Sequence, residues 1–215
     1  MKPVQLFFKN LFGSLFNTKC CICGCVKSCL KDGEIMCESC VKQFEFYTNK
    51  EHKIFDGVII NSLIKYNDFS KKVVRKLKFQ YKKDLSKTLA RLVCENFLKD
   101  NDFVLVPVPA HKARLNKYGF NHTQVICEEI KKLKGCKINN KILSKSRETL
   151  TQHFLSQEQR FKNVQNSFKI NSDNYNNENI LVIDDITTTG ATLEEIIKAF
   201  KKESINKITC LTIFK

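Results

Sequence analysis

One stretch of the chain, residues 179–192, strongly constrains the fold. It reads NILVIDDITTTGAT, in which an apolar run is followed by two adjacent carboxylates and a Thr-rich turn with one glycine. A short apolar run of this kind is typical of a buried parallel strand, and residues 191–200 after the turn have the pattern of a helix. We therefore expect the turn at the carboxyl end of a strand and the amino end of a helix, where backbone N–H groups attract phosphate.

The residue types in this stretch suit two parts of one ligand. Thr hydroxyls and the flexible Gly190 let the loop close around an anion. Asp184 and Asp185 would repel that anion, but they suit sugar hydroxyls or a metal ion beside it. An ordinary strand-to-helix connection with an N-cap Thr is the alternative explanation of the same residues.

The stretch resembles the phosphoribosyl-diphosphate (PRPP) motif of type I phosphoribosyltransferases. The resemblance implies that Asp184 and Asp185 contact the ribose 2′- and 3′-hydroxyls and are the catalytic acids. It also implies a ring of residues around the 5′-phosphate: Thr187, Thr188, Thr189, Gly190, Ala191 and Thr192. In a transferase, Mg²⁺ would bridge the diphosphate and the ribose hydroxyls.

The rest of the chain has the pattern of an α/β domain. Its 215 residues, 42% of them hydrophobic, suffice for one such domain and a small accessory module. We predict strands at residues 54–66, 103–108, 180–183 and 207–214, and helices at 70–98, 121–134 and 191–200. Residues 145–163 have the composition of a mobile loop, and 171–179 that of an exposed linker. This alternation predicts a parallel, doubly wound sheet with its ligand at the carboxyl ends of the strands.

A cysteine-rich segment precedes this domain. Two CxxC pairs, thirteen residues apart, offer four thiolates to one tetrahedral Zn²⁺: Cys20, Cys23, Cys37 and Cys40. A four-thiolate site is closed, so the zinc would be structural. Cys21, Cys25 and Cys29 leave the choice of ligands open, and a redox dithiol is an alternative. We divide the chain into a zinc-binding module at residues 1–50 and a phosphoribosyltransferase-like domain at 51–215.

The chain is strongly basic, with a net charge of +15. Residues 65–91 and 111–147 each hold ten basic against two acidic residues, net +8. Such patches suit nucleic acid or a ligand rich in phosphates, although a lysine-rich composition of the whole chain explains them equally well. Residues 6–16 have the pattern of an amphipathic helix, and the sequence lacks the roughly 20-residue apolar run that spans a bilayer.

A second set of motifs makes the resemblance more specific. Val106-Pro107-Val108-Pro109, then His111, Lys112 and Arg114, then Gly119-Phe120-Asn121, and a later block from Arg147 to Phe168 resemble the signature of the ComF family. The two CxxC pairs in front fit the same family, so the resemblance covers nearly the entire chain. Tyr118 and His122 depart from the pattern of the family.

The ComF resemblance implies further site residues. It assigns the turn after residue 108 to the diphosphate, with His111, Lys112 and Arg114 as contacts, and it places Arg147 and Arg160 in a loop that closes over the ligand. Arginine offers a fork of donors that matches phosphate oxygens. A solvated loop is the alternative for Arg147, and an exposed or capping residue the alternative for His111.

The resemblance implies a role in bacterial competence, the uptake and processing of transforming DNA. One hypothesis is a cytoplasmic protein that binds PRPP and single-stranded DNA, works with other DNA-uptake or recombination proteins, and associates with the membrane at the uptake machinery. The other is an active phosphoribosyltransferase of unknown acceptor in nucleotide metabolism. The sequence leaves open turnover, the acceptor, the oligomeric state and the DNA-binding face.

Overall fold

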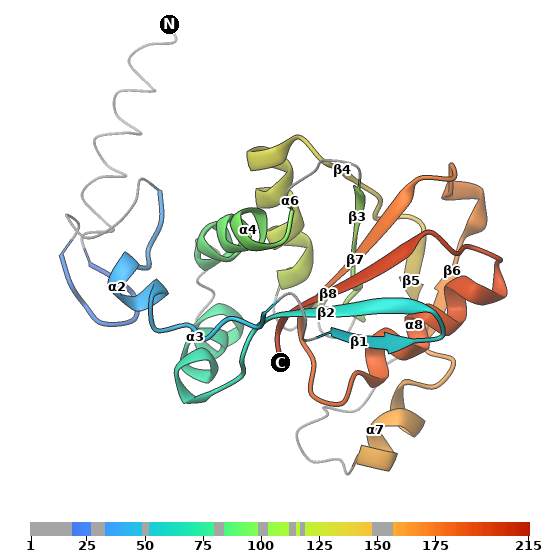
Figure 1. Ribbon diagram of the computed structural model, residues 1–215, viewed down its shortest axis with the longest axis horizontal. Helices are drawn as coiled ribbons and strands as arrows, with labels where there is room; N and C mark the ends of the chain where they lie inside the picture. Colours follow the sequence, from blue (N-terminus) through green and yellow to red (C-terminus); the bar gives the residue numbers. More distant parts are fainter. Residues whose placement is uncertain are drawn as a thin grey trace, which may run out of the picture.

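A central sheet organises the computed structural model, which describes residues 19–26, 33–48, 52–79, 84–98, 103–111, 115–116, 119–147 and 157–215. In this part of the chain, six strands pair in the order β1-β2-β8-β7-β3-β4 (Figure 1). Their bounds are β1 His52–Phe55, β2 Val58–Ile64, β3 Phe103–Pro107, β4 Lys137–Ile138, β7 Asn179–Ile186 and β8 Ile208–Phe214. All neighbours run parallel except β1 and β2, which form an antiparallel hairpin at one edge.

The two central strands have the sequence expected of parallel strands. β7 and β8 are buried over most of their length, and both contain nearly continuous apolar runs because helices cover both faces of such a sheet. The strands predicted at residues 180–183 and 207–214 are therefore confirmed, as is the strand that ends beside Pro107.

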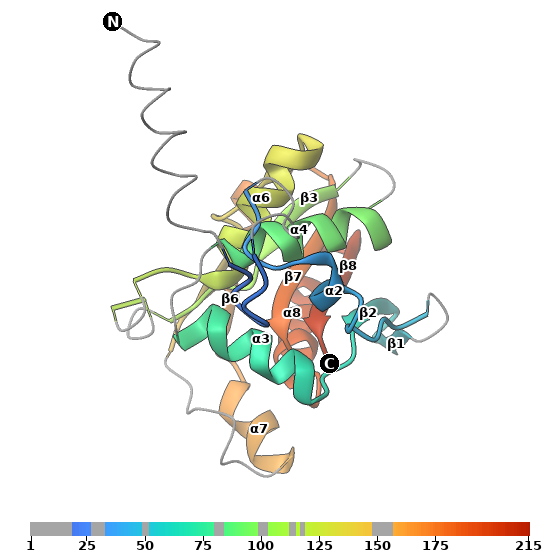
Figure 2. The ribbon, with the colours of Figure 1, turned by 90° about the vertical axis from the view of Figure 1, so that its left-hand side faces the viewer.

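Helices cover the sheet on both sides, so the predicted α/β fold is confirmed. One face carries α3 (Asp68–Phe79), α4 (Leu85–Asn96) and α6 (His122–Lys134). The other carries α8 (Ala191–Lys202) and a small antiparallel pair, β5 (Leu143–Lys145) with β6 (Phe168–Ile170). Figure 2 views the molecule from the side of α3 and α4. Along β7, Leu181 and Ile183 pack toward the first face, and Ile180 and Val182 toward the second.

Two sequence predictions differ from the structure, and a third, the exposed linker, gains a short helical turn. The helix predicted over residues 70–98 is two helices, α3 and α4. The predicted loop at 145–163 contains α7 (Gln157–Val164), and the predicted linker at 171–179 contains the 3₁₀ turn η3 (Ser172–Asn174). α7 has a polar sequence with little periodicity. Arg147 stabilises it by donating to the backbone oxygens of Gln165 (2.7 Å) and Lys162 (3.5 Å), near the end of the helix.

The cysteine-rich segment packs on the face that carries α4. Its short helix α2 (Glu38–Val41) is preceded by Ile35 and Met36, and these residues share the hydrophobic core with the sheet. Arg91 of α4 holds the segment through ion pairs with Glu34 (2.7 Å) and Glu38 (2.8 Å). The hydroxyl of Thr88 also donates to Glu34 (2.8 Å), so the buried Glu34 carboxylate has charged and neutral partners.

None of the helices in the described part of the chain combines the length and the apolar character needed to cross a membrane.

We expect Arg91→Ala to lower the free energy of unfolding by about 3 kcal/mol, because the Glu34 carboxylate would stay buried without its cation. Urea titration of the metal-loaded protein measures this change. Arg75→Ala, which removes an exposed arginine from α3, is the matched control and should change the free energy little. Equal effects of the two substitutions would contradict this role of Arg91.

Candidate functional site

The carboxyl ends of β3 and β7 lie side by side at one edge of the sheet. Pro107 pairs with Ile183, and the backbone N–H of Val108 donates to the oxygen of Ile183 at 2.9 Å. The acid pair follows Ile183 directly, and the turn after Pro109 starts at the same edge. Both sequence motifs therefore lie where they were predicted, at the carboxyl ends of parallel strands.

The two carboxylates at the end of β7 point to different faces of the sheet. Side chains alternate along a strand, so Asp184 lies toward α8 and β5, and Asp185 toward α3. The Asp185 carboxylate accepts an ion pair from Lys78 at 2.7 Å. The positive charges of Lys78 and, more weakly, of Lys145 at the end of β5 both act on Asp184. Each acid thus has a lysine on its own side of the sheet.

Asp184 is the more buried of the pair. Its exposed fraction is only 7%, and its Oδ1 accepts the backbone N–H of Asp185 at 2.9 Å. Burial and the neighbouring charge of Asp185 raise the pKa of Asp184 to about 7, although Lys78 and Lys145 act in the opposite direction. Near neutral pH the pair therefore carries less than its full negative charge, and a cation that binds it must displace a proton.

Lys78 belongs to the site although no motif marks it. It lies in the last turn of α3, and in the sequence it is one of many lysines between residues 65 and 91. Its ammonium reaches Asp185 because α3 packs on the face of the sheet to which that acid points. The amphipathic pattern of α3 predicts which side of the helix is buried, but not which strand end the helix approaches.

The start of α6 completes this side of the site. The Asn121 side chain accepts the N–H of Thr123 (3.1 Å) and donates to the oxygen of Val108 (2.9 Å), which attaches the helix to the end of β3. His122 is buried against Phe120, with ring centroids 4.6 Å apart. Burial lowers the pKa of His122. The negative charge of Asp185 raises this pKa, and the positive charge of Lys78 lowers it further. A neutral imidazole therefore lies near the acid pair.

The Thr-rich turn forms a compact loop at the amino end of α8. The N–H of Thr187 donates to the oxygen of Phe214 (2.9 Å), which anchors the loop to β8. The hydroxyl of Thr187 accepts the N–H of Gly190 (3.2 Å), and Gly190 adopts φ of 90°, a conformation that favours glycine. The structure thus has the strand, loop and helix N-terminus that an anion site requires.

An ion pair lies beneath this loop. Glu194, buried in the first turn of α8, pairs with Lys53 of β1. A Cβ added to Gly190 would lie 3.5 Å from the Glu194 carboxylate and 3.7 Å from the Lys53 ammonium. The hairpin therefore brings a positive charge to the loop and compensates an acid that would otherwise repel an anion there. Sequence reasoning missed both residues, because they lie on elements far apart in the chain.

The other predicted site residues are only partly described. His111 lies just after the end of β3, and its backbone oxygen accepts the N–H of Leu115 at 3.1 Å. Lys112 and Arg114 lie outside the described residues. Arg160 lies in α7 with its side chain outside the described part, and Arg147 contacts the backbone at the end of that helix. Their contacts with a ligand stay predictions.

The two CxxC pairs come together as one cluster, and the sulfur atoms of Cys20, Cys23, Cys37 and Cys40 lie within 4.8 Å of one another. Cys20 and Cys40 are 3.8 Å apart, and Cys23 and Cys37 are 3.6 Å apart. A tetrahedron with Zn–S bonds of about 2.3 Å has sulfur separations of about 3.8 Å. The N–H groups of Ile22 and Cys37 also donate to the Cys20 sulfur (3.4 Å each), so the cluster suits a thiolate-bound metal.

Comparison with known proteins indicates a phosphoribosyltransferase-type domain in the part of the chain that contains the acid pair. The phosphoribosyl transferase domain family matches residues 133–215, which include the acid pair and the loop. The DNA utilization protein YhgH of Escherichia coli is 28% identical over 131 residues, 58% of this chain and 57% of that protein, so the chain spans little more than half the length of this relative. Competence protein F of Haemophilus influenzae is 24% identical over 190 residues, 80% of this chain and 81% of that protein.

Two further similarities complete the comparison. Competence protein ComFC of Bacillus subtilis is 29% identical over 155 residues, 66% of this chain and 58% of that protein. A solved structure of the allosteric regulatory enzyme of purine biosynthesis aligns with a TM-score of 0.38 and 18% identity, over 60% of this chain and 24% of the other.

The raised pKa of Asp184 predicts a pH dependence of stability. The folded protein keeps the proton up to about pH 7, whereas an unfolded Asp releases it near pH 4. The folded state thus binds more protons in this window, and the free energy of unfolding should fall as pH rises from about 4 to about 7. Asp184→Asn should remove the part of this decrease in the free energy of unfolding that comes from Asp184.

Urea titrations at several pH values, without divalent cations, measure the difference between variant and wild type. Asp68→Asn, at an exposed position on α3, is the control and should keep the wild-type dependence between pH 5 and 7. A difference between Asp184→Asn and wild type that does not vary with pH would contradict the assignment.

Proposed function

Because the chain belongs to the ComF family, we propose that it acts in natural transformation, where it binds PRPP or a related phosphate ligand and handles transforming single-stranded DNA. The observation that carries the ligand assignment is the acid pair, with Asp184 buried and Asp185 half-buried, beside a phosphate-type loop at the start of α8. The names of the relatives, which refer to competence and DNA utilization, support the biological role.

The proposed ligand lies across the carboxyl edge of the sheet. Asp184 and Asp185 accept the ribose hydroxyls, and the backbone N–H groups of residues 188–192 hold the 5′-phosphate. Both carboxylates are hard oxygen ligands at the sheet edge, which fits Mg²⁺, an ion that proteins bind through one or two carboxylates plus substrate phosphates. When bound, the ion would neutralise part of the diphosphate charge.

The lysines around the acid pair support binding of a polyanion at this edge. Lys78 already contacts Asp185, and its ammonium would attract a diphosphate bound beside that carboxylate. Lys112, Arg114 and His111 follow the adjacent strand and are the proposed contacts on the diphosphate side. The neutral His122 adds a polar group near the acids without adding charge.

Zinc is the metal that we propose for the cysteine cluster. Four thiolates at tetrahedral separations leave no open position for water, so the metal stabilises the module at residues 1–50 and takes no part in chemistry. The module packs against α4, and its helix α2 contributes residues to the hydrophobic core that the module shares with the sheet. It therefore supports the domain at 51–215 from the face of the sheet that also positions Lys78.

For DNA, a basic surface on α3 is one proposed contact. The exposed side of α3 carries Lys71, Lys72, Arg75 and Lys76 around a shallow depression, with Asp68 as the acid among them. Such a surface attracts the phosphate backbone independently of sequence. We place the protein in the cytoplasm, at the inner side of the uptake machinery, together with other DNA-uptake or recombination proteins.

An active phosphoribosyltransferase is the second candidate. The acid pair, the loop and the nearby cationic groups are the parts that such a reaction uses, in which a nucleophile displaces diphosphate from the anomeric carbon. Positive charge near the leaving diphosphate would stabilise the transition state. The two candidates differ in turnover, which is measurable without knowledge of the acceptor.

Protein purified without chelator should contain about one Zn²⁺ per chain by elemental analysis. Cys37→Ser should lose most of the metal and lower the melting temperature, because the segment has little core of its own. Cys25→Ser, which lies outside the cluster, should keep the metal content and the melting temperature of the wild type. Metal-free wild-type protein, or equal metal loss in both variants, would refute the zinc assignment.

PRPP with Mg²⁺ should raise the melting temperature of the wild type, by an amount equivalent to about 3 kcal/mol at a concentration of about 100 times Kd. Asp184→Asn combined with Asp185→Asn should abolish this shift. The matched control, Asp173→Asn with Glu203→Gln, removes two exposed charges and should preserve the shift.

The same variants test the biological role. A strain with the Asp184/Asp185 substitutions at normal protein level should transform at least about tenfold less often than the control strain. Diphosphate release from PRPP, with and without nucleobases or nucleic acid, separates the two candidates. Unchanged transformation would reject the proposed role of the site, and turnover that depends on the acids would favour the transferase.

A further inference from the structure

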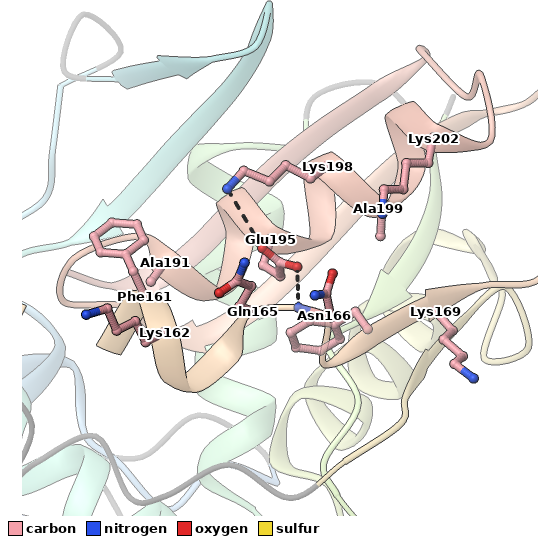
Figure 3. Close-up of a pocket in the computed structure, with 11 residues that line it drawn as sticks. Phe161, Lys162, Gln165, Asn166, Lys169, Ala191, Glu195, Lys198, Ala199 and Lys202 are labelled. Carbon is pink, nitrogen blue, oxygen red and sulfur yellow. Dashed lines mark hydrogen bonds and ion pairs between the residues drawn. The ribbon is translucent and has the colours of Figure 1, made fainter. Parts of the chain in front are cut away.

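A groove runs along the outer side of α8, next to the candidate site. It lies between α7, β6 and α8 and has a volume of about 520 Å³ (Figure 3). Lys162, Lys169, Lys198 and Lys202 line it, with Phe161 at the end near Ala191. No sequence motif marks these residues, because three separate elements contribute them.

The groove has a strong excess of positive charge. Four lysines face a single acid in the lining, Glu195. That carboxylate is already engaged, since it accepts the backbone N–H of Asn166 at 2.6 Å and lies 3.8 Å from the Lys198 ammonium. The pair of Lys162 with Glu158 is exposed on both sides and therefore weak. The lysines are thus available to a negatively charged partner.

The groove approaches the acid pair at two places. Ala191, the first residue of α8, lines the groove and directly follows the phosphate-type loop. On the other side, the Lys145 ammonium lies 5.4 Å from the centre of the Phe168 ring, which also lines the groove, and the charge of Lys145 acts on Asp184. A partner in the groove therefore ends beside the loop and the buried acid.

We propose that this groove holds a segment of single-stranded nucleic acid, with its backbone phosphates on the lysines of α8 and β6. The inference rests on the proposed function and adds a second basic face, across the sheet from α3, to the surfaces that bind the strand. α8 has 12 residues, so it is about 18 Å long and spans roughly five stacked nucleotides. Phe161, half-buried at the end near Ala191, offers a ring on which a base stacks.

A direct test measures binding of a fluorescent single-stranded oligonucleotide of about 16 nucleotides by anisotropy, at several salt concentrations. The wild type should bind with an affinity that falls steeply with salt. Lys198→Gln combined with Lys202→Gln should weaken binding at low salt by about tenfold and reduce the slope of log affinity against log salt by about 1.4, roughly 0.7 for each lost phosphate contact.

The matched control is Lys131→Gln combined with Lys132→Gln. These exposed lysines lie on α6, across the sheet from the groove, and their loss changes the net charge by the same amount. The control should keep the wild-type slope of log affinity against log salt. Both variants should also keep the wild-type melting temperature and its shift with PRPP, which shows that the fold and the loop are intact.

The outcomes separate this inference from the proposed function. Wild-type protein that does not bind the oligonucleotide at low salt would overturn DNA binding as a whole. Wild-type binding with equal effects of the groove and control variants would overturn the groove alone. Displacement of the oligonucleotide by polyglutamate as efficiently as by unlabelled DNA would overturn the choice of nucleic acid and assign the groove to an acidic protein.

Discussion

Parallel pairing of β7 with both β3 and β8 is the constraint on which the site depends. Because the three strands run in the same direction, the acids at the end of β7, the helix that follows β3 and the anchor of the loop at Phe214 all meet at one edge. The buried apolar residues of β7 fix its register. A slip by one residue would exchange the faces of Asp184 and Asp185 and separate each acid from its lysine.

Charge compensation from distant elements is the second requirement of this architecture. The domain has a half-buried acid at the strand end and a buried acid at the start of α8, and each has a basic partner: Lys78 of α3 for Asp185 and Lys53 of β1 for Glu194. The Glu34–Arg91 pair repeats this arrangement where the cysteine cluster meets α4. The helices and the hairpin therefore do more than cover the sheet, because their packing also brings a basic side chain to each of these acids.

The sequence predicted the parts of the site whose chemistry is local. The apolar run, the acids, the turn and the helix of residues 179–202 are contiguous, and the CxxC spacing brings four sulfurs together by itself. Lys78, Lys53 and the groove depend on which helix or hairpin reaches which strand end, and a single sequence does not contain that information. α7 was missed because its residues are polar and a tertiary contact from Arg147 stabilises its end. The boundary between α3 and α4 was missed because apolar spacing continues through both helices.

The Lys78–Asp185 pair has a consequence for ligand selection. Lys78 is a counter-ion tethered to the protein, so it already neutralises part of the charge of the acid pair and cannot diffuse away. A neutral sugar gains little there, because it would have to separate an existing ion pair to reach the carboxylate. A ligand that brings both its own divalent cation and a polyphosphate offers each member of the pair a new partner. The proposed ligand would therefore have to exchange both ions of this pair at once.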